Sequence, residues 1–152
     1  MNTRILVVDD ELLITDFLEE RLTLENFRVF TAAGVIDAFE ILNNREIDLV
    51  ISDMKMPNLG GMDLLREINM KHPGLPVIFM TAYATIPDTV HAIKSGAIDY
   101  ITKPFQGEEV LGQNRLTEDL MLNKPDSSTW LNSDNLLYFY HRLVQKISEV
   151  SL

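Results

Sequence analysis

The chain has 152 residues, enough for one domain of ordinary size with a short appendage. Hydrophobic residues make up 46% of it and charged residues 24%, which is typical of a globular protein and unlike a disordered chain. The formal net charge of -10 disfavours sequence-independent binding to nucleic-acid phosphates, because such binding needs clustered lysine and arginine.

The chain contains no cysteine, which excludes disulfides, thiolate zinc sites and a cysteine nucleophile. The apolar run near the N-terminus is too short for a signal peptide. No apolar segment approaches the roughly 18 residues that are needed to cross a bilayer. We therefore expect a cytoplasmic location, no contact with a membrane and no direct binding to DNA.

Short apolar runs alternate with segments of helical periodicity along most of the chain. The runs with strand character cover residues 5–8, 27–31, 49–51, 76–81 and 98–102, and the helical segments cover 12–25, 34–43, 62–71, 87–94 and 108–122. This alternation predicts a parallel sheet with helices on both faces and right-handed crossovers. The strand order 2-1-3-4-5 would bring the polar ends of strands one, three and five together. We therefore predict an α/β, flavodoxin-like fold of five βα units.

The apolar side chains of the helical segments recur near the spacing of one helix face. The residues expected to face inward are Leu13, Phe17, Leu18, Leu22 and Leu24 in the first helix, Ala38, Ile41 and Leu42 in the second, and Leu64, Leu65 and Ile68 in the third.

Residues 123–152 differ in character from the part before them. Residues 123–129 are rich in turn-forming types and predict a linker, after which Ser133 or Asp134 could cap a helix that runs to Val150. The apolar stripe of this helix consists of Leu136, Leu137, Tyr140, Leu143, Val144, Ile147 and Val150. The expected division is a domain of residues 1–122 and a linker with an amphipathic helix over 123–152. The stripe could pack on the chain's own domain, on a second copy or on a partner helix.

Five polar side chains stand at strand ends on one edge of the predicted sheet: Asp9, Asp10, Asp53, Thr81 and Lys103. Neighbouring carboxylates repel one another, and Mg²⁺ relieves this because it accepts carboxylates, water and phosphate oxygens. A carboxylate can also attack phosphorus, giving an aspartyl phosphate whose charge needs a cation, an ammonium and a hydroxyl or N–H donor. The set as a whole therefore predicts phosphoryl transfer to a carboxylate.

Each of these residues alone has a simpler interpretation. Two aspartates after a strand are often a turn or a helix cap, and a single aspartate before a Pro-Gly loop is more often a turn residue. A threonine that ends a strand is usually structural, and an isolated surface lysine is usually only solvated. It is their joint occurrence at the ends of strands one, three, four and five that favours a site.

Residues 3–111 resemble the receiver domain of bacterial two-component response regulators. The matching stretches are Ile5-Leu-Val-Val-Asp-Asp-Glu11, Val50-Ile-Ser-Asp-Met-Lys-Met-Pro57, Gly61, Val77-Ile-Phe-Met-Thr-Ala82, Gly96-Ala97 and Asp99-Tyr-Ile-Thr-Lys-Pro-Phe105. Residues 80–87 and 92–100 look most like receivers of the nitrogen-regulation type, which precede AAA+ σ54 activators.

The resemblance implies that Asp53 is the phosphoacceptor and that a sensor histidine kinase supplies the phosphoryl group. It implies Mg²⁺ bound by Asp10, by Asp53 and by the backbone carbonyl of Lys55, with Asp9 assisting.

The resemblance further implies that Thr81, Lys103 and the backbone N–H of Ala82 contact the phosphoryl group. Thr81 would move toward it, and the ring of Tyr100 would fill the vacated space, so that the surface of the fourth helix and fifth strand changes. The peptide bond between Lys103 and Pro104 would be cis, as is usual in the family.

Three functions stay open at this point. The first is a phosphorylation-operated switch that catalyses only its own phosphorylation and dephosphorylation. The second is a pseudo-receiver that acts as a constitutive interaction module, and the third is a Mg²⁺-dependent phosphatase, which would need an acid where the chain has Lys55.

Family members often continue into an output domain, and the roughly 30 residues after the receiver part are too few for one. A homodimer through the fourth helix, fifth strand and fifth helix, or through the C-terminal helix, is a further possibility.

Overall fold

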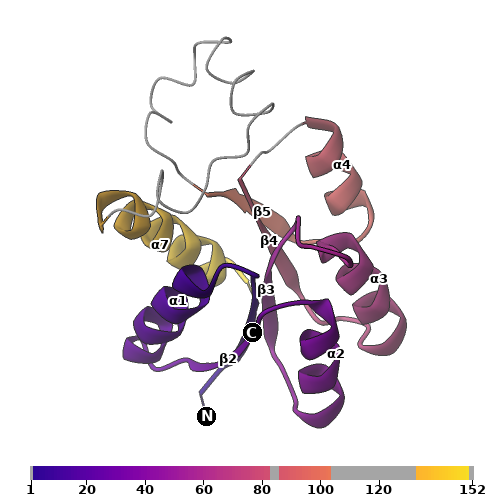
Figure 1. The fold of residues 1–152 in the computed structure, drawn as a ribbon, viewed down its shortest axis with the longest axis horizontal. Coiled ribbons are helices and arrows are strands. Elements are labelled where there is room, and N and C mark those ends of the chain that lie inside the picture. The colour runs from indigo at the N-terminus through magenta and orange to yellow at the C-terminus, as the bar shows by residue number, and fades with distance from the viewer. Residues whose placement is uncertain (1, 83–85, 104–132, 151–152) are drawn as a thin grey trace.

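The computed structural model describes residues 2–82, 86–103 and 133–150, and Figure 1 draws the other residues as a grey trace. The elements, in chain order, are β1 (Arg4–Val8), α1 (Leu12–Leu24), β2 (Arg28–Ala32), α2 (Val35–Asn44), β3 (Leu49–Asp53), α3 (Gly61–Lys71), β4 (Val77–Thr81), α4 (Ile86–Lys94), β5 (Asp99–Thr102) and α7 (Ser133–Ser148). The strands are parallel and form one sheet in the order β2-β1-β3-β4-β5. The predicted flavodoxin-like α/β fold and its strand order are confirmed.

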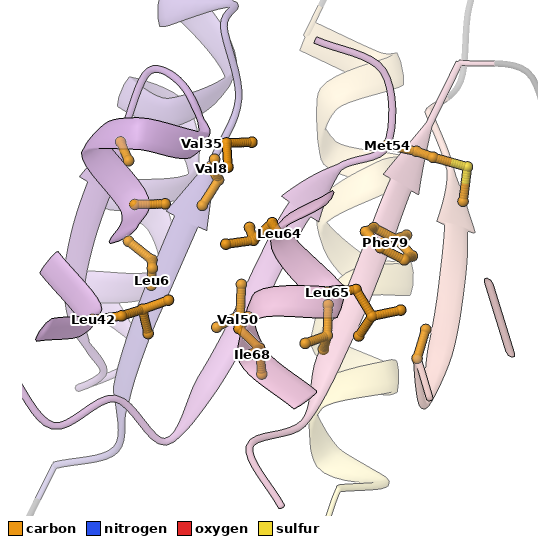
Figure 2. Close-up of a cluster of buried hydrophobic side chains, with 14 of the residues drawn as sticks. Leu6, Val8, Val35, Leu42, Val50, Met54, Leu64, Leu65, Ile68 and Phe79 are labelled. Atoms are coloured by element: carbon orange, nitrogen blue, oxygen red, sulfur yellow. The ribbon is translucent and has the colours of Figure 1, made fainter. Parts of the chain in front are cut away.

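Side chains alternate between the two faces of the sheet, and each face has its own core. In β1, Ile5 and Val7 belong to the cluster under α1 and α7, whereas Leu6 and Val8 belong to the cluster under α2 and α3. Figure 2 shows the second cluster, in which Leu6 and Val50 from the sheet lie close to side chains of α2 and α3. Because the central strands are buried on both faces, their sequences are continuous apolar runs rather than alternating ones.

The predicted third strand, residues 49–51, is two residues too short. β3 continues through Asp53, which pairs with Met80 in the parallel ladder, and the backbone N–H of Met54 still donates to the carbonyl of Met80 at 2.9 Å. The polar side chains of Ser52 and Asp53 predict an end at residue 51, but backbone pairing does not depend on side-chain polarity. The predicted helix over 108–122 and the cis peptide bond at Lys103–Pro104 lie outside the described residues.

The inward faces were predicted correctly for α3, where Leu64, Leu65 and Ile68 are buried. For α1 the prediction was partly wrong, because Leu13 and Leu24 are 62% and 71% exposed. The buried apolar residues of α1 are Ile14, Leu18 and Leu22, which follow one another at four-residue spacing and so share one face. Leu13 and Leu24 lie off that face.

The C-terminal helix α7 packs on the chain's own domain, beside α1 (Figure 1). Phe139, Leu143 and Ile147 are buried in the same cluster as α1, β1 and β3. Phe139 was missing from the predicted stripe, although it lies one helical turn before Leu143. The division of the chain at residue 122 stays a prediction, because residues 104–132 are not among those described.

Polar contacts also hold α7 in place. The ring of Tyr140 meets that of Phe17 edge-on, with centroids 6.1 Å apart, and its hydroxyl donates to the carbonyl of Arg21 at 3.2 Å. Lys146 Nζ lies 3.0 Å from Asp99 Oδ2 at the start of β5. In the part of the chain that the structure describes, no helix is long and apolar enough to cross a membrane.

Leu143→Ala is expected to lower the free energy of unfolding by about 2–5 kcal/mol, because it leaves a cavity in the core under α7. Urea denaturation followed by circular dichroism measures the change. Tyr138→Ala is the control on the same helix, where the side chain is 56% exposed and a far smaller effect is expected. Equal small effects of the two substitutions would mean that α7 does not contribute to the core.

Candidate functional site

The carboxyl ends of four strands meet at one edge of the sheet and carry polar side chains. Asp9 follows β1, Asp53 ends β3, Thr81 ends β4 and Lys103 follows β5. The parallel registers align these ends, since Asp53 pairs with Met80, the neighbour of Thr81. All four side chains are buried. The structure therefore brings together residues that lie up to 94 positions apart, from Asp9 to Lys103, as the sequence predicted.

Lys103 is the centre of this cluster. Its side-chain nitrogen Nζ lies 2.8 Å from Asp9 Oδ2, 3.3 Å from Asp53 Oδ2 and 3.5 Å from Glu11 Oε1. Its backbone N–H donates to the carbonyl of Thr81 at 2.7 Å, which fixes the start of its side chain beside β4. One buried ammonium is thus surrounded by three carboxylates, and its positive charge offsets only part of theirs.

The surrounding charges shift the pKa values of both partners. Burial raises the pKa of Asp9 to about 7, and the charge of Asp53 adds to this rise, whereas Lys103 opposes it. For Lys103, burial alone would lower the pKa, but the carboxylates of Asp53 and Asp9 outweigh it and hold the pKa above its ordinary value. Lys103 is therefore charged at neutral pH, and Asp9 shares the excess of negative charge.

Asp9, Asp10 and Asp53 form a set that could hold a metal ion. Each offers a carboxylate oxygen, and these oxygens all lie within 4.8 Å of one another. Asp9 Oδ2 is buried, and its close contact is with the ammonium of Lys103 at 2.8 Å. Three carboxylates this close, with a single ammonium between them, form a hard oxygen donor set that fits Mg²⁺.

The loop after β3 brings the backbone close to these carboxylates. The N–H of Lys55 points to Asp53 Oδ1 at 3.4 Å, and the exposed Lys55 side chain lies 4.0 Å from Asp88 Oδ2 of α4. At Gly61, a Cβ atom would lie 2.6 Å from the ring of Phe79 and 2.7 Å from the carbonyl oxygen of Asp53. Only glycine allows α3 to begin this close to the end of β3.

The two remaining predicted residues, Ala82 and Tyr100, pack on opposite faces of the sheet. Ala82 follows Thr81 and is half-buried. Tyr100 is half-buried in β5 and packs against the cluster of α2 and α3, on the opposite face from α7. Glu11 is the site residue that the sequence did not assign a role, although three consecutive acids after a strand were a signal for it.

Comparison with known families decides what kind of domain this is. The family described as "Response regulator receiver domain" matches residues 5–114. The chain belongs to the response regulator receiver family. Receiver domains are signalling domains that histidine kinases phosphorylate, and they typically bind Mg²⁺ at an acidic pocket. Membership therefore implies phosphorylation-dependent signalling.

Relatives support this assignment. "Transcriptional regulatory protein GlrR" of Escherichia coli (strain K12) is 42% identical over 100 residues, which are 66% of this chain and 22% of that protein. "DNA-binding transcriptional regulator NtrC" of Proteus hauseri is 36% identical over 133 residues, which are 86% of this chain and 27% of that protein. The likeness to receivers of the nitrogen-regulation type agrees with these relatives.

Among solved structures, the non-phosphorylated HemR receiver domain of Leptospira biflexa is 33% identical with a TM-score of 0.65. The match covers 82% of this chain and 99% of that one. The receiver thus corresponds to a whole solved domain, whereas it spans less than a third of GlrR and NtrC.

Asp9→Asn is expected to raise the free energy of unfolding at about pH 8 without Mg²⁺, by about 1–4 kcal/mol, because it removes a charge whose burial is unfavourable and which also repels Asp53. The pKa of Asp9 is raised from 3.8 to about 7 on folding, so its protonation stabilises the fold at low pH. This stabilisation is lost as the pH rises through that window, and the variant should escape the loss.

Urea denaturation at about pH 5 and about pH 8 measures the difference, which should be larger at the higher pH. The control is Asp16→Asn on the exposed side of α1, for which no such pH dependence is expected. A variant less stable than the natural chain at both pH values would contradict the assigned excess of negative charge.

Proposed function

We propose that the chain is a phosphorylation-operated switch in the cytoplasm. A sensor histidine kinase would phosphorylate Asp53 with Mg²⁺ bound, and the surface of α4 and β5 would change to control a partner or output domain. The observation that carries the proposal is the cluster of Asp9, Asp53 and Lys103 at the carboxyl edge of a receiver sheet, with Lys103 Nζ 2.8–3.3 Å from both carboxylates.

Asp53 is the proposed nucleophile. One of its carboxylate oxygens forms a bond to phosphorus while the bond from phosphorus to the donor histidine nitrogen breaks. The imidazole leaves with that electron pair and takes up a proton. Lys103, already 3.3 Å from Asp53 Oδ2, would stabilise the charge on the transferring group, and the hydroxyl of Thr81 and the N–H of Ala82 would donate to its oxygens.

Mg²⁺ would be held by Asp9, Asp10, Asp53 and the backbone carbonyl of Lys55. When bound, it would supply positive charge that offsets the repulsion among the carboxylates and the transferring phosphoryl group. The raised pKa of Asp9 supports this role, because burial and the neighbouring charge of Asp53 both penalise its carboxylate, and a divalent cation would offset both effects.

The switch would follow from the added charge. A phosphoryl group brings roughly -1.5 to -2 charges and strong acceptor oxygens to the end of β3. Thr81 would shift toward it, and Tyr100, which is half-buried on β5, would reorient with the neighbouring surface. This is a two-state element biased by one local contact.

A homodimer would form more readily through α4 and β5 than through α7. The apolar face of α7 is buried in its own domain, whereas Val90, Ile93 and Ile98 on the α4 side are 43–45% exposed. The proposed receiver domain covers residues 1–122, and α7 packs on it through the apolar cluster that it shares with α1.

Asp53→Asn is expected to abolish labelling by a small phosphodonor such as acetyl phosphate in the presence of Mg²⁺, because the amide cannot act as the nucleophile. Intact-mass spectrometry measures the labelled fraction. Asp37→Asn, an exposed aspartate in the first turn of α2, is the control and should label like the natural chain. Unchanged labelling of the Asp53 variant would refute the assignment.

Beryllofluoride, a phosphate mimic, is expected to bind only with Mg²⁺ and to alter the surface of α4 and β5. Hydrogen exchange measured with and without the mimic should show changed protection in these elements and little change in α2. A pseudo-receiver would show neither binding nor altered protection. Sustained turnover of a phosphomonoester would instead favour the phosphatase hypothesis. That hypothesis is disfavoured because position 55, where such an enzyme needs an acid, is a lysine.

A further inference from the structure

Glu11 is the third acid after β1 and has no place in the proposed metal site. The set of carboxylates that could share a metal ion consists of Asp9, Asp10 and Asp53. Glu11 nevertheless lies at the site, because its Oε1 is 3.5 Å from Lys103 Nζ and its side chain is only 19% exposed. Glu11 is thus a carboxylate of the site that pairs with the Lys103 ammonium and lies outside the set that could hold a metal ion.

The backbone of Glu11 is held firmly on both sides. Its N–H donates to Asp9 Oδ1 at 2.9 Å, and its carbonyl accepts the N–H of Ile14 at 3.0 Å as α1 begins. Glu11 therefore occupies the N-cap of α1, where a serine or aspartate side chain would normally bond to the helix. The Glu11 side chain makes no such capping hydrogen bond and is directed to Lys103 instead.

The other two partners of Lys103 have competing roles. In the proposed function, Asp9 and Asp53 would share their charge with Mg²⁺, and Asp53 would also carry the phosphoryl group. Glu11 would then be the carboxylate that keeps its charge for Lys103 throughout the transfer. Because a lysine side chain has several rotatable bonds, a carboxylate 3.5 Å from its ammonium, on a residue whose backbone is hydrogen-bonded on both sides, favours one position of that ammonium.

We propose that Glu11 is a positioning residue, which holds the ammonium of Lys103 toward the phosphoryl-binding edge while Asp9 and Asp53 engage the cation and the phosphoryl group. The inference rests on the proposed function. It adds a role for a residue outside the metal set and outside the groups that would touch the phosphoryl oxygens.

The test is a double-mutant cycle between Glu11 and Lys103, with beryllofluoride binding at saturating Mg²⁺ as the readout. Saturating Mg²⁺ keeps differences in metal affinity out of the comparison. Glu11→Gln is expected to weaken beryllofluoride binding about two- to fivefold in the natural background, the range for a partly exposed ion pair. In the Lys103→Met background the same substitution should have no effect, because the partner is gone.

Glu46→Gln is the matched control, since Glu46 also pairs with a cation, Arg4, but lies at the opposite end of β1. It should bind beryllofluoride like the natural chain. Unchanged or tighter binding by Glu11→Gln, or an equal loss in both Lys103 backgrounds, would overturn the positioning role. Failure of the natural chain to bind beryllofluoride would instead refute the proposed function itself.

A second measurement covers the case in which Lys103→Met does not fold. The side-chain ammonium resonance of Lys103, observed by NMR with beryllofluoride and Mg²⁺ bound, reports how firmly the group is held. It should be sharp in the natural chain and in Glu46→Gln, and broadened or lost in Glu11→Gln. An unchanged resonance in Glu11→Gln would overturn the inference.

Discussion

The buried ammonium of Lys103 is the constraint on which the site depends. A lysine that is 99% buried is tolerated only where anions surround it, and here carboxylates approach it from the loop after β1 and from the end of β3. These carboxylates in turn would repel one another without it. The cluster therefore exists only because the order β2-β1-β3-β4-β5 places the ends of β1, β3 and β5 near one another.

Packing on both faces of the sheet fixes that geometry. On one side α2 and α3 cover the sheet, and the absence of a side chain at Gly61 lets α3 begin directly against the end of β3. On the other side α1 and α7 cover it, with Phe139 and Leu143 reaching the same cluster as Ile5. Protein interiors are close-packed and resist small shifts. The packed core therefore keeps the carboxylates close to one another although their charges repel.

The sequence predicted the fold and the meeting of Asp9, Asp53, Thr81 and Lys103, because apolar periodicity and strand-end chemistry are local signals. It did not predict how far β3 extends, since Asp53 stays in the ladder through backbone hydrogen bonds that side-chain type does not reveal. It misplaced Leu13 and Leu24 because an apolar residue can lie at any helix position, and only the neighbouring strands decide which face is covered. The sequence also left open whether α7 packs on its own domain, because an apolar helix face does not reveal which surface covers it.

The contact of Glu11 with Lys103 is another feature that the sequence did not predict. The sequence shows three consecutive acids. It does not show that Asp9 and Asp10 lie beside Asp53 while Glu11 contacts Lys103, because this depends on the direction of each side chain. That direction is set by the start of α1, which turns the chain so that Asp10 is exposed while Glu11 faces the site. Spacing alone carries no such information.

The position of β5 connects the site to the surface of the domain. Among the described residues β5 is an edge strand, and its backbone pairs with β4. It carries Tyr100, and Lys103 follows it, while Asp99 at its start binds both Lys146 of α7 and the N–H of Tyr100. The strand that precedes Lys103 thus lies at an edge of the sheet, and the ion pair of Asp99 with Lys146 holds its start against α7. Under the proposed function, a change in the charge around Lys103 would act on a strand that carries Tyr100 on one face and whose start contacts α7, so β5 is a physical route from the site to the surface.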